Sequence, residues 1–337
     1  MSKVGELMSK KVETISSMRL PVDEVLEIKR CRYTPQDTNK TNSKVLPRIC
    51  IVTGTHGDEL EGQYICYELS RKLQENPQYI KGIVDIYPAL NPLGIDSISR
   101  GIPNFDLDMN RIFPGSDEGS IVRKVAHNIV QSLKDADLVI DIHASNIFLR
   151  EIPQARINEN MVENLLPLAS LLNLDFLWIH PAATVLESTL CHSLNVIGTP
   201  CIVVEMGVGM RITKEYGDQF LTGIFNVMKE LSIWSGDIEN TSKSHKAINS
   251  MKHEVFFINS AESGIFVPSI DHCTTVNKGD KIGDILDPLE GRIKEQIIAP
   301  CNGMVFTLRE YPIVYTGSLV ARLIGEETAA NEKGNNI

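Results

Sequence analysis

The sequence lacks long apolar runs and lacks an excess of positive charge, and both absences narrow the classes of protein it can be. Its longest apolar runs fall far short of the roughly 20 residues that a membrane-spanning helix needs. The 337 residues carry a net charge of −10, and no basic stripe interrupts this acidic balance. We therefore expect neither a membrane nor a nucleic acid as a partner.

Paired cysteines and a signal peptide are also missing. The seven cysteines are scattered and form no C-x-x-C pair, which is typical of reduced thiols. The N-terminal stretch MSKVGELMSKK has positive charges but no apolar segment after them. These features predict a cytoplasmic protein.

Apolar periodicity is what the sequence does contain, and it predicts an α/β domain over residues 1–235. Strand patterns alternate with helix patterns, which is typical of a mostly parallel sheet flanked by helices. The predicted strands cover residues 18–32, 48–53, 82–87, 137–143, 175–179 and 200–205, after a frayed N-terminus. The predicted helices cover residues 59–76, 121–133, 160–172, 187–194 and 214–231. Residues 88–119 form a long loop rich in turn formers. A loop of that length is usually functional or disordered, and its arginines favour a functional one.

The composition changes after residue 235. Residues 236–250 are polar and predict a linker, and residues 251–325 are short strands punctuated by glycines. This pattern predicts a small all-β domain that resembles a barrel-sandwich hybrid, followed by a mobile tail over residues 326–337. Biotinyl and lipoyl carrier proteins with that fold bind their cofactor covalently through a lysine. Lys294 lacks the flanking methionines of a biotin site, so we do not expect a covalent cofactor.

A metal site is predicted around the stretch CIVTGTHGDELEG, which covers Cys50 to Gly62. His56 and Glu59 are three residues apart and follow an apolar strand, so they can face one another at the start of a helix. An imidazole and a carboxylate so placed are two of the three protein ligands of a catalytic zinc site. His143 closes the strand DLVIDIH, where a third ligand belongs. Taken alone, each of these histidines could equally be structural.

Other polar residues could complete a hydrolytic site. Glu205 ends the apolar strand PCIVVE and could act as general base, although an ion-paired glutamate is the alternative. Arg111 with Asn110 could hold a carboxylate, and Arg100 could stabilise an oxyanion, unless these loop side chains are simply solvated. Asp141 could orient His143, a task that a backbone carbonyl performs as often. Asp106 and Asp108 could orient the arginines.

In order and spacing, these motifs resemble the succinylglutamate desuccinylase/aspartoacylase family of the zinc carboxypeptidase clan. The motifs are GTHGDELEG, Asn91-Pro92, NRIFPG from Asn110, DLVIDIHAS and IVVEMGVG. The resemblance is close over residues 46–232 and extends through the C-terminal β region. It implies one zinc ion per chain bound by His56, Glu59 and His143, with Glu205 as general acid and base. It also implies Asn110 and Arg111 at the substrate's carboxylate and Arg100 at the scissile carbonyl.

The sequence thus predicts a zinc-dependent hydrolase that cleaves the amide bond of an N-acyl amino acid by metal-activated water. A metallocarboxypeptidase acting on short peptides is the alternative, and a non-catalytic binding protein is a third. The expected partner is a small molecule bearing a carboxylate. The sequence is compatible with a homo-oligomer but does not determine the oligomeric state. It identifies neither the acyl group nor the amino acid, and it leaves open whether Tyr311 or Tyr315 reaches the site.

Overall fold

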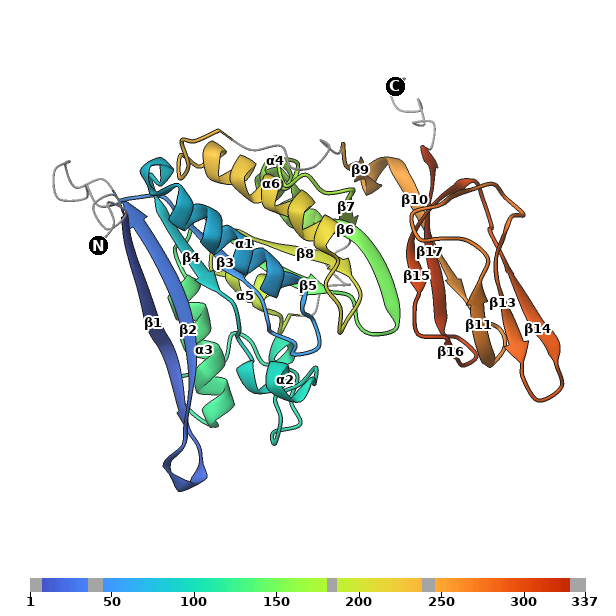
Figure 1. Cartoon of the computed structure of the whole chain (residues 1–337), viewed down its shortest axis with the longest axis horizontal. Helices are drawn as coiled ribbons and strands as arrows, with labels where there is room; N and C mark the ends of the chain where they lie inside the picture. Colours follow the sequence, from blue (N-terminus) through green and yellow to red (C-terminus); the bar gives the residue numbers. More distant parts are fainter. Residues whose placement is uncertain (1–7, 36–44, 181–186, 238–245, 328–337) are drawn as a thin grey trace, which may run out of the picture.

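The computed structural model describes residues 8–35, 45–180, 187–237 and 246–327. It has the predicted α/β architecture, with a large mixed sheet that continues into a second, antiparallel β region at the C-terminal end (Figure 1). In this described part, no helix is both long enough and apolar enough to cross a membrane. The predicted fold class is therefore confirmed.

The large sheet has a parallel centre and antiparallel flanks. Its order is β1-β2-β4-β3-β5-β8-β6-β15-β17-β10, and β3, β4, β5 and β8 run parallel to one another. The strands of the first two-thirds of the chain are β1 (Met8–Arg19), β2 (Val25–Pro35), β3 (Arg48–Val52), β4 (Ile83–Tyr87), β5 (Leu138–Ala144), β6 (Leu149–Asn158), β7 (Phe176–His180) and β8 (Cys201–Gly207). The carboxyl ends of β3, β5 and β8 consequently lie at the same end of the sheet. The predicted site residues lie at or just after these strand ends.

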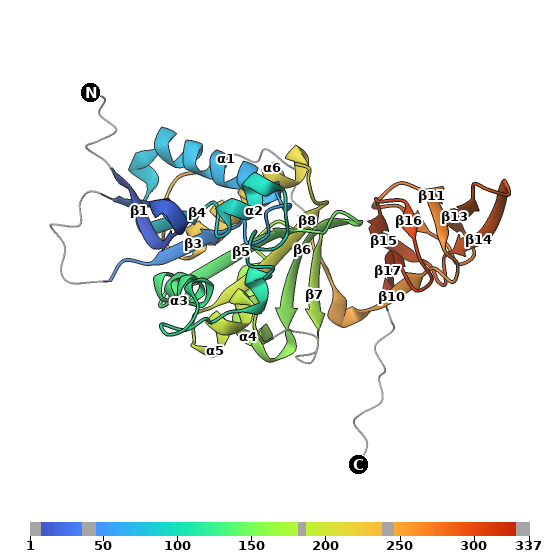
Figure 2. The same cartoon turned by 90° about the horizontal axis from the view of Figure 1, so that it is seen from below.

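Helices cover both faces of this sheet (Figure 2). They are α1 (Glu61–Glu75), α2 (Pro92–Ser97), α3 (Ile121–Leu133), α4 (Val162–Ala169), α5 (Leu190–Val196) and α6 (Lys214–Glu230). Because successive strand residues point to opposite faces, Ile51 packs with the core beneath α1 and α6, whereas Val52 packs with the core beneath α3 and α5. The five helices predicted from periodicity are all present, with ends shifted by a few residues.

Three regions differ from the predictions. The single strand expected over residues 18–32 is two strands, β1 and β2, joined at Leu20–Glu24, and β1 includes residues 8–11 that we expected to be frayed. Strand β1 was missed because its apolar pattern is weak. Its pairing with β2 holds it in the sheet. The predicted loop contains α2 and a short 3-10 turn at Met109–Arg111. Strand β6 was not predicted at all.

The C-terminal region consists of two antiparallel layers, as Figure 1 shows at the red end of the chain. Strand β9 (Ile248–Asn249) precedes these layers and pairs in parallel with β7. The strands of the layers are β10 (His253–Asn259), β11 (Gly264–Pro268), β12 (Thr275–Val276), β13 (Lys281–Asp287), β14 (Arg292–Ile298), β15 (Gly303–Arg309), β16 (Ile313–Val314) and β17 (Leu319–Glu327). Strand β15 pairs with β6, so one layer is continuous with the large sheet. The domain limits at 235, 250 and 325 stay predictions, and residues 238–245 and 328–337 lie outside the described residues.

Phe306 is a fully buried side chain at this junction. It lies on β15, and its ring packs against Phe176 at 5.0 Å and Trp178 at 5.7 Å between ring centres. Both partners belong to β7, which pairs with β6. The contact therefore ties the C-terminal layer to the large sheet.

We predict that Phe306→Ala lowers the free energy of unfolding by about 3–5 kcal/mol, because it leaves a cavity in a packed core. Tyr315→Ala is the control, since Tyr315 is 70% exposed, and it should change stability by less than about 0.5 kcal/mol. Chemical denaturation of both variants measures the difference. A loss below about 1 kcal/mol for Phe306→Ala would show that this contact does not hold the junction together.

Candidate metal and substrate site

A tight turn after β3 carries the first two predicted ligands. A Cβ atom on Gly57 would lie 1.9 Å from the carbonyl carbon of Gly94 in α2, so only glycine allows this approach. Met210 donates its backbone N–H to the Asp58 carbonyl at 2.6 Å from the other side. These contacts delay the helix until Glu61, so His56 and Glu59 lie in the turn before α1 and not within its first turn as predicted.

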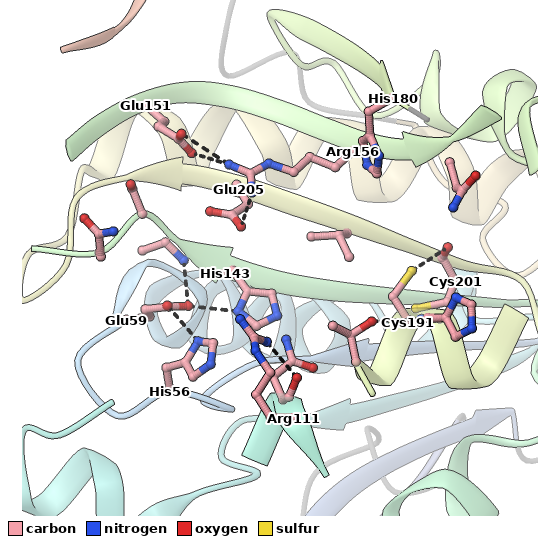
Figure 3. Close-up of a pocket in the computed structure, with 18 of the residues that line it drawn as sticks. His56, Glu59, Arg111, His143, Glu151, Arg156, His180, Cys191, Cys201 and Glu205 are labelled. Carbon is pink, nitrogen blue, oxygen red and sulfur yellow. Dashed lines mark hydrogen bonds and ion pairs between the residues drawn. The ribbon is translucent and has the colours of Figure 1, made fainter. Parts of the chain in front are cut away.

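Glu59 joins the two histidines of the predicted metal site (Figure 3). Its Oε1 lies 2.7 Å from Nδ1 of His56, and its Oε2 lies 2.9 Å from Nδ1 of His143. The potential ligand atoms of the three residues all lie within 4.8 Å of one another. Each residue is buried, with exposures of 2%, 4% and 4% for His56, Glu59 and His143. Two nitrogens and one oxygen thus converge on one point.

The outer nitrogens of both imidazoles face carboxylates. Nε2 of His56 is hydrogen-bonded to Oδ1 of Asp108 at 3.0 Å, whereas Nε2 of His143 lies 3.2 Å from Oδ2 of Asp141 as a charge contact without hydrogen-bond geometry. Metal-binding histidines commonly donate their second N–H to a carboxylate, which fixes the ring and leaves the other nitrogen free to bind. The donor set and its surroundings therefore fit a catalytic zinc ion.

The charges around Glu59 and His143 favour an ionised carboxylate on Glu59 and positive charge on the groups beside it. Burial alone would raise the pKa of Glu59, but His143 and His56 hold it well below its ordinary value. Burial alone would lower the pKa of His143, but Asp141 and Glu59 raise it well above its ordinary value. A buried carboxylate between two imidazoles thus requires a compensating cation, which protons or a metal ion can supply.

The long loop places its predicted residues beside this group. Arg100 is bound to the ligand set itself, with Nη1 3.0 Å from Glu59 Oε1 and Nε 3.3 Å from Asp108 Oδ2. Asn110 accepts a hydrogen bond from the Leu190 backbone N–H through Oδ1 at 2.9 Å, which ties the loop to α5. Arg111 is exposed and donates to the Asn110 carbonyl at 2.7 Å. Among the described residues, Arg111 is paired with no carboxylate.

Glu205 lies next to His143 on the neighbouring strand, because these two residues are direct partners in the β5–β8 pairing. Burial raises the pKa of Glu205 above its ordinary value, and the guanidinium of Arg156 opposes that rise. Nη1 of Arg156 lies 3.0 Å from Glu205 Oε1, so the ion-paired glutamate that we considered as the alternative is also present. The two possibilities are compatible, since Glu205 still lines the site.

One cavity of about 630 Å³ connects these groups. All seven residues predicted for the site line it, namely His56, Glu59, Arg100, Asn110, Arg111, His143 and Glu205. Neither Tyr311 nor Tyr315 does. Tyr311 instead packs its ring against Phe148, which lines the cavity, with 5.7 Å between ring centres. The roles of the seven residues in binding and catalysis stay predictions.

Three charged cavity residues were missed. They are Glu151 and Arg156 on β6 and Arg322 on β17. Strand β6 has the sequence LREIPQARIN, and its charged residues and Pro153 obscure the apolar pattern by which strands are recognised. The available signal was the alternation of apolar Leu149, Ala155 and Ile157 with polar neighbours, interrupted at a register shift between Glu151 and Gln154.

The fold and the site together define an α/β protein with a buried His-Glu-His group beside a glutamate at a sheet edge. The catalytic-domain model of the succinylglutamate desuccinylase/aspartoacylase family matches residues 45–231. The chain therefore belongs to the succinylglutamate desuccinylase/aspartoacylase family, as its sequence predicted, and this family is named for two enzymes that remove acyl groups.

Individual relatives agree with this assignment. An N-alpha-acetyl-L-2,4-diaminobutyric acid deacetylase from Halomonas elongata is 33% identical over 110 residues. That match spans only about a third of each protein, 32% of this chain and 32% of the relative. A succinylglutamate desuccinylase/aspartoacylase from Rhodobacter sphaeroides has 21% identity and a TM-score of 0.76, covering 95% of this chain and 96% of the other. The product-bound ectoine utilization protein EutE (DoeB) from Ruegeria pomeroyi has 19% identity and a TM-score of 0.76, with 95% of both chains covered. These two likenesses establish the fold alone.

Proposed function

We propose that this protein is a zinc-dependent hydrolase that cleaves the amide bond of an N-acyl amino acid. One observation carries the proposal: the buried group His56, Glu59 and His143 opens onto the same cavity as Glu205 and Arg111. A metal site, a proton-transferring carboxylate and an uncompensated cation are the parts that hydrolysis of a carboxylate-bearing amide needs.

His56, Glu59 and His143 would hold the zinc ion. When bound, zinc supplies a Lewis acid that polarises a carbonyl group and lowers the pKa of water. Asp108 would keep the His56 imidazole oriented through its hydrogen bond with Nε2, and Asp141 lies close enough to Nε2 of His143 to stabilise a positive charge there. Arg100, which lines the same cavity and contacts Glu59 and Asp108, would stabilise the oxyanion that forms at the scissile carbonyl.

Glu205 would take a proton from the attacking water and deliver it to the leaving amine. Its burial raises its pKa, which suits a group that must both accept and release a proton near neutral pH. Arg111, together with Asn110, would bind the substrate's carboxylate. Arg111 is suited to this because its guanidinium projects into the cavity without a carboxylate partner among the described side chains.

The family name and the Halomonas elongata relative both support deacylation over peptide hydrolysis. A metallocarboxypeptidase acting on short peptides remains the alternative, since it uses the same parts. A cytoplasmic location also remains a proposal. It is supported by the seven cysteines, all of which lie in the described part and are free thiols.

The purified protein should contain about one zinc ion per chain, because His56, Glu59 and His143 provide one three-ligand set. Elemental analysis measures the metal content, and a chelator should remove both metal and activity. His143→Ala should lose the metal. His192→Ala, which changes a histidine lining the same cavity outside the ligand set, should retain it. Full activity in metal-free protein would refute the mechanism.

Glu205→Gln should keep the metal but lower kcat by about 100- to 10,000-fold, because the amide cannot accept a proton. Steady-state hydrolysis of N-acetyl, N-succinyl and N-formyl amino acids, with short peptides alongside, provides the assay. Glu230→Gln, which alters an exposed carboxylate at the end of α6, is the matched control. Near-normal turnover by Glu205→Gln would remove this residue from its proposed role.

Arg111→Ala should raise KM for carboxylate-bearing substrates by about 10- to 100-fold, the value of a charge-assisted hydrogen bond. The exposed Arg123 on α3 gives the control variant Arg123→Ala, which should leave KM unchanged. Substrates whose carboxylate is replaced by an amide should show little difference between Arg111→Ala and the unmodified protein. If KM for the acids is unaffected, the carboxylate binds elsewhere.

A further inference from the structure

A second buried carboxylate lies in the cavity wall, away from the metal ligands. Glu151 on β6 is 1% exposed, and three side chains donate hydrogen bonds to it. Gln154 and Arg156 each reach its Oε2 at 2.9 Å, and Arg322 of β17 reaches its Oε1. A carboxylate buried this deeply is tolerated only when it is paired and hydrogen-bonded.

Arg156 connects this carboxylate to Glu205 (Figure 3). Its Nη2 binds Glu151, and its Nη1 lies 3.0 Å from Oε1 of Glu205. In the strand pairing, Arg156 lies opposite Val203, two residues before Glu205 on β8, so it reaches Glu205 along the cavity wall. No second ion pair or side-chain hydrogen bond of Glu205 is found among the described residues. The position of the Glu205 carboxylate therefore depends on Arg156.

Arg322, a residue of the C-terminal region, helps to hold the side chains of Glu151 and Arg156 in this arrangement. Arg322 lies on β17, and its guanidinium carbon is 5.3 Å from the centre of the Trp178 ring and 5.5 Å from that of Phe257. The guanidinium carbon of Arg156 lies 5.4 Å from the same Trp178 ring. Stacking on an aromatic face restricts the movement of a guanidinium group. The cavity wall is thus held by strands from both parts of the chain.

We propose that Arg156 is a positioning residue for Glu205, and that Glu151 with Arg322 of the C-terminal region holds Arg156 in place. The inference rests on the proposed function, in which Glu205 transfers the proton. It assigns the C-terminal β region a part in the reaction through Arg322, which acts by holding Glu151 and Arg156. The planar guanidinium matters because it binds two carboxylates through different nitrogens, whereas the compact ammonium of lysine cannot hold both in the same geometry.

Arg156→Lys should lower kcat by about 10- to 100-fold while KM changes by less than about threefold, because Glu205 loses its orientation and substrate binding is retained. Zinc content should be unchanged. Arg292→Lys, which alters an exposed arginine on β14, is the matched control and should leave both constants unaltered. Unchanged kcat in Arg156→Lys would overturn the inference. A raised KM at normal kcat would also overturn it, since Arg156 would then be a substrate contact.

Glu151→Gln provides a second variant that leaves Arg156 intact. It removes the charge that anchors Arg156, so kcat should again fall while KM is retained, and unchanged kcat would count against the inference. Stability gives a readout that is independent of activity. Thermal unfolding midpoints of Arg156→Lys, Glu205→Gln and the double variant should be non-additive by about 2 °C or more. Additive shifts would show that the pair is not coupled. Failure of the unmodified protein to hydrolyse any test substrate would end the proposed function, and the unfolding cycle would still test the pair.

Discussion

A carboxylate enclosed by protein is the constraint from which the rest of this site follows. Glu59 is 4% exposed and contacts two imidazoles, the guanidinium of Arg100 and the backbone N–H of Ala144. Burying an unpaired carboxylate costs several kcal/mol, so its surroundings must supply positive charge. Each neighbour meets part of that need, and a metal ion bound by Glu59 and the two histidines would meet all of it.

The fold satisfies this constraint by bringing three chain segments to one sheet edge. Gly57 allows the turn after β3 to press against α2, which places His56 and Glu59 ahead of α1. Strand β5 ends with His143, and β8 brings Glu205 beside it. The same problem of a buried carboxylate recurs at Glu151, where the solution uses a residue of the C-terminal region. Because β6 pairs with β15, a strand of the C-terminal region, a residue of that region can reach Glu151.

Much of this arrangement could be predicted from the sequence, because local signals specify it. Strand-end positions and the H-x-x-E spacing located His56, Glu59, His143 and Glu205, and the structure places all four on one cavity. What could not be predicted depends on contacts distant in sequence. Strand β6 is held by partners on both sides, and its buried Glu151 is paired with Arg322, which lies far along the chain. No local pattern encodes that contact.

The C-terminal β region shows the same limit. Its glycine spacing predicted a separate small domain, and the antiparallel strands are there. The sequence did not reveal that one of its layers extends the large sheet, because strand pairing between residues 149–151 and 307–309 has no sequence signature. Which of Tyr311 and Tyr315 reaches the site was left open for a similar reason, since the contact of Tyr311 with Phe148 at the cavity wall joins distant parts of the chain.

X-ray absorption at the zinc edge tests the central claim most directly, because it reports the atoms bound to the metal whatever the substrate. For the zinc-loaded protein, the account predicts two imidazole nitrogens at about 2.0–2.1 Å together with oxygen ligands and no sulfur. In the His143→Ala protein, any residual zinc should have lost one imidazole. A spectrum with thiolate ligands, or one unchanged by His143→Ala, would contradict the assignment of His56, Glu59 and His143 as the metal centre.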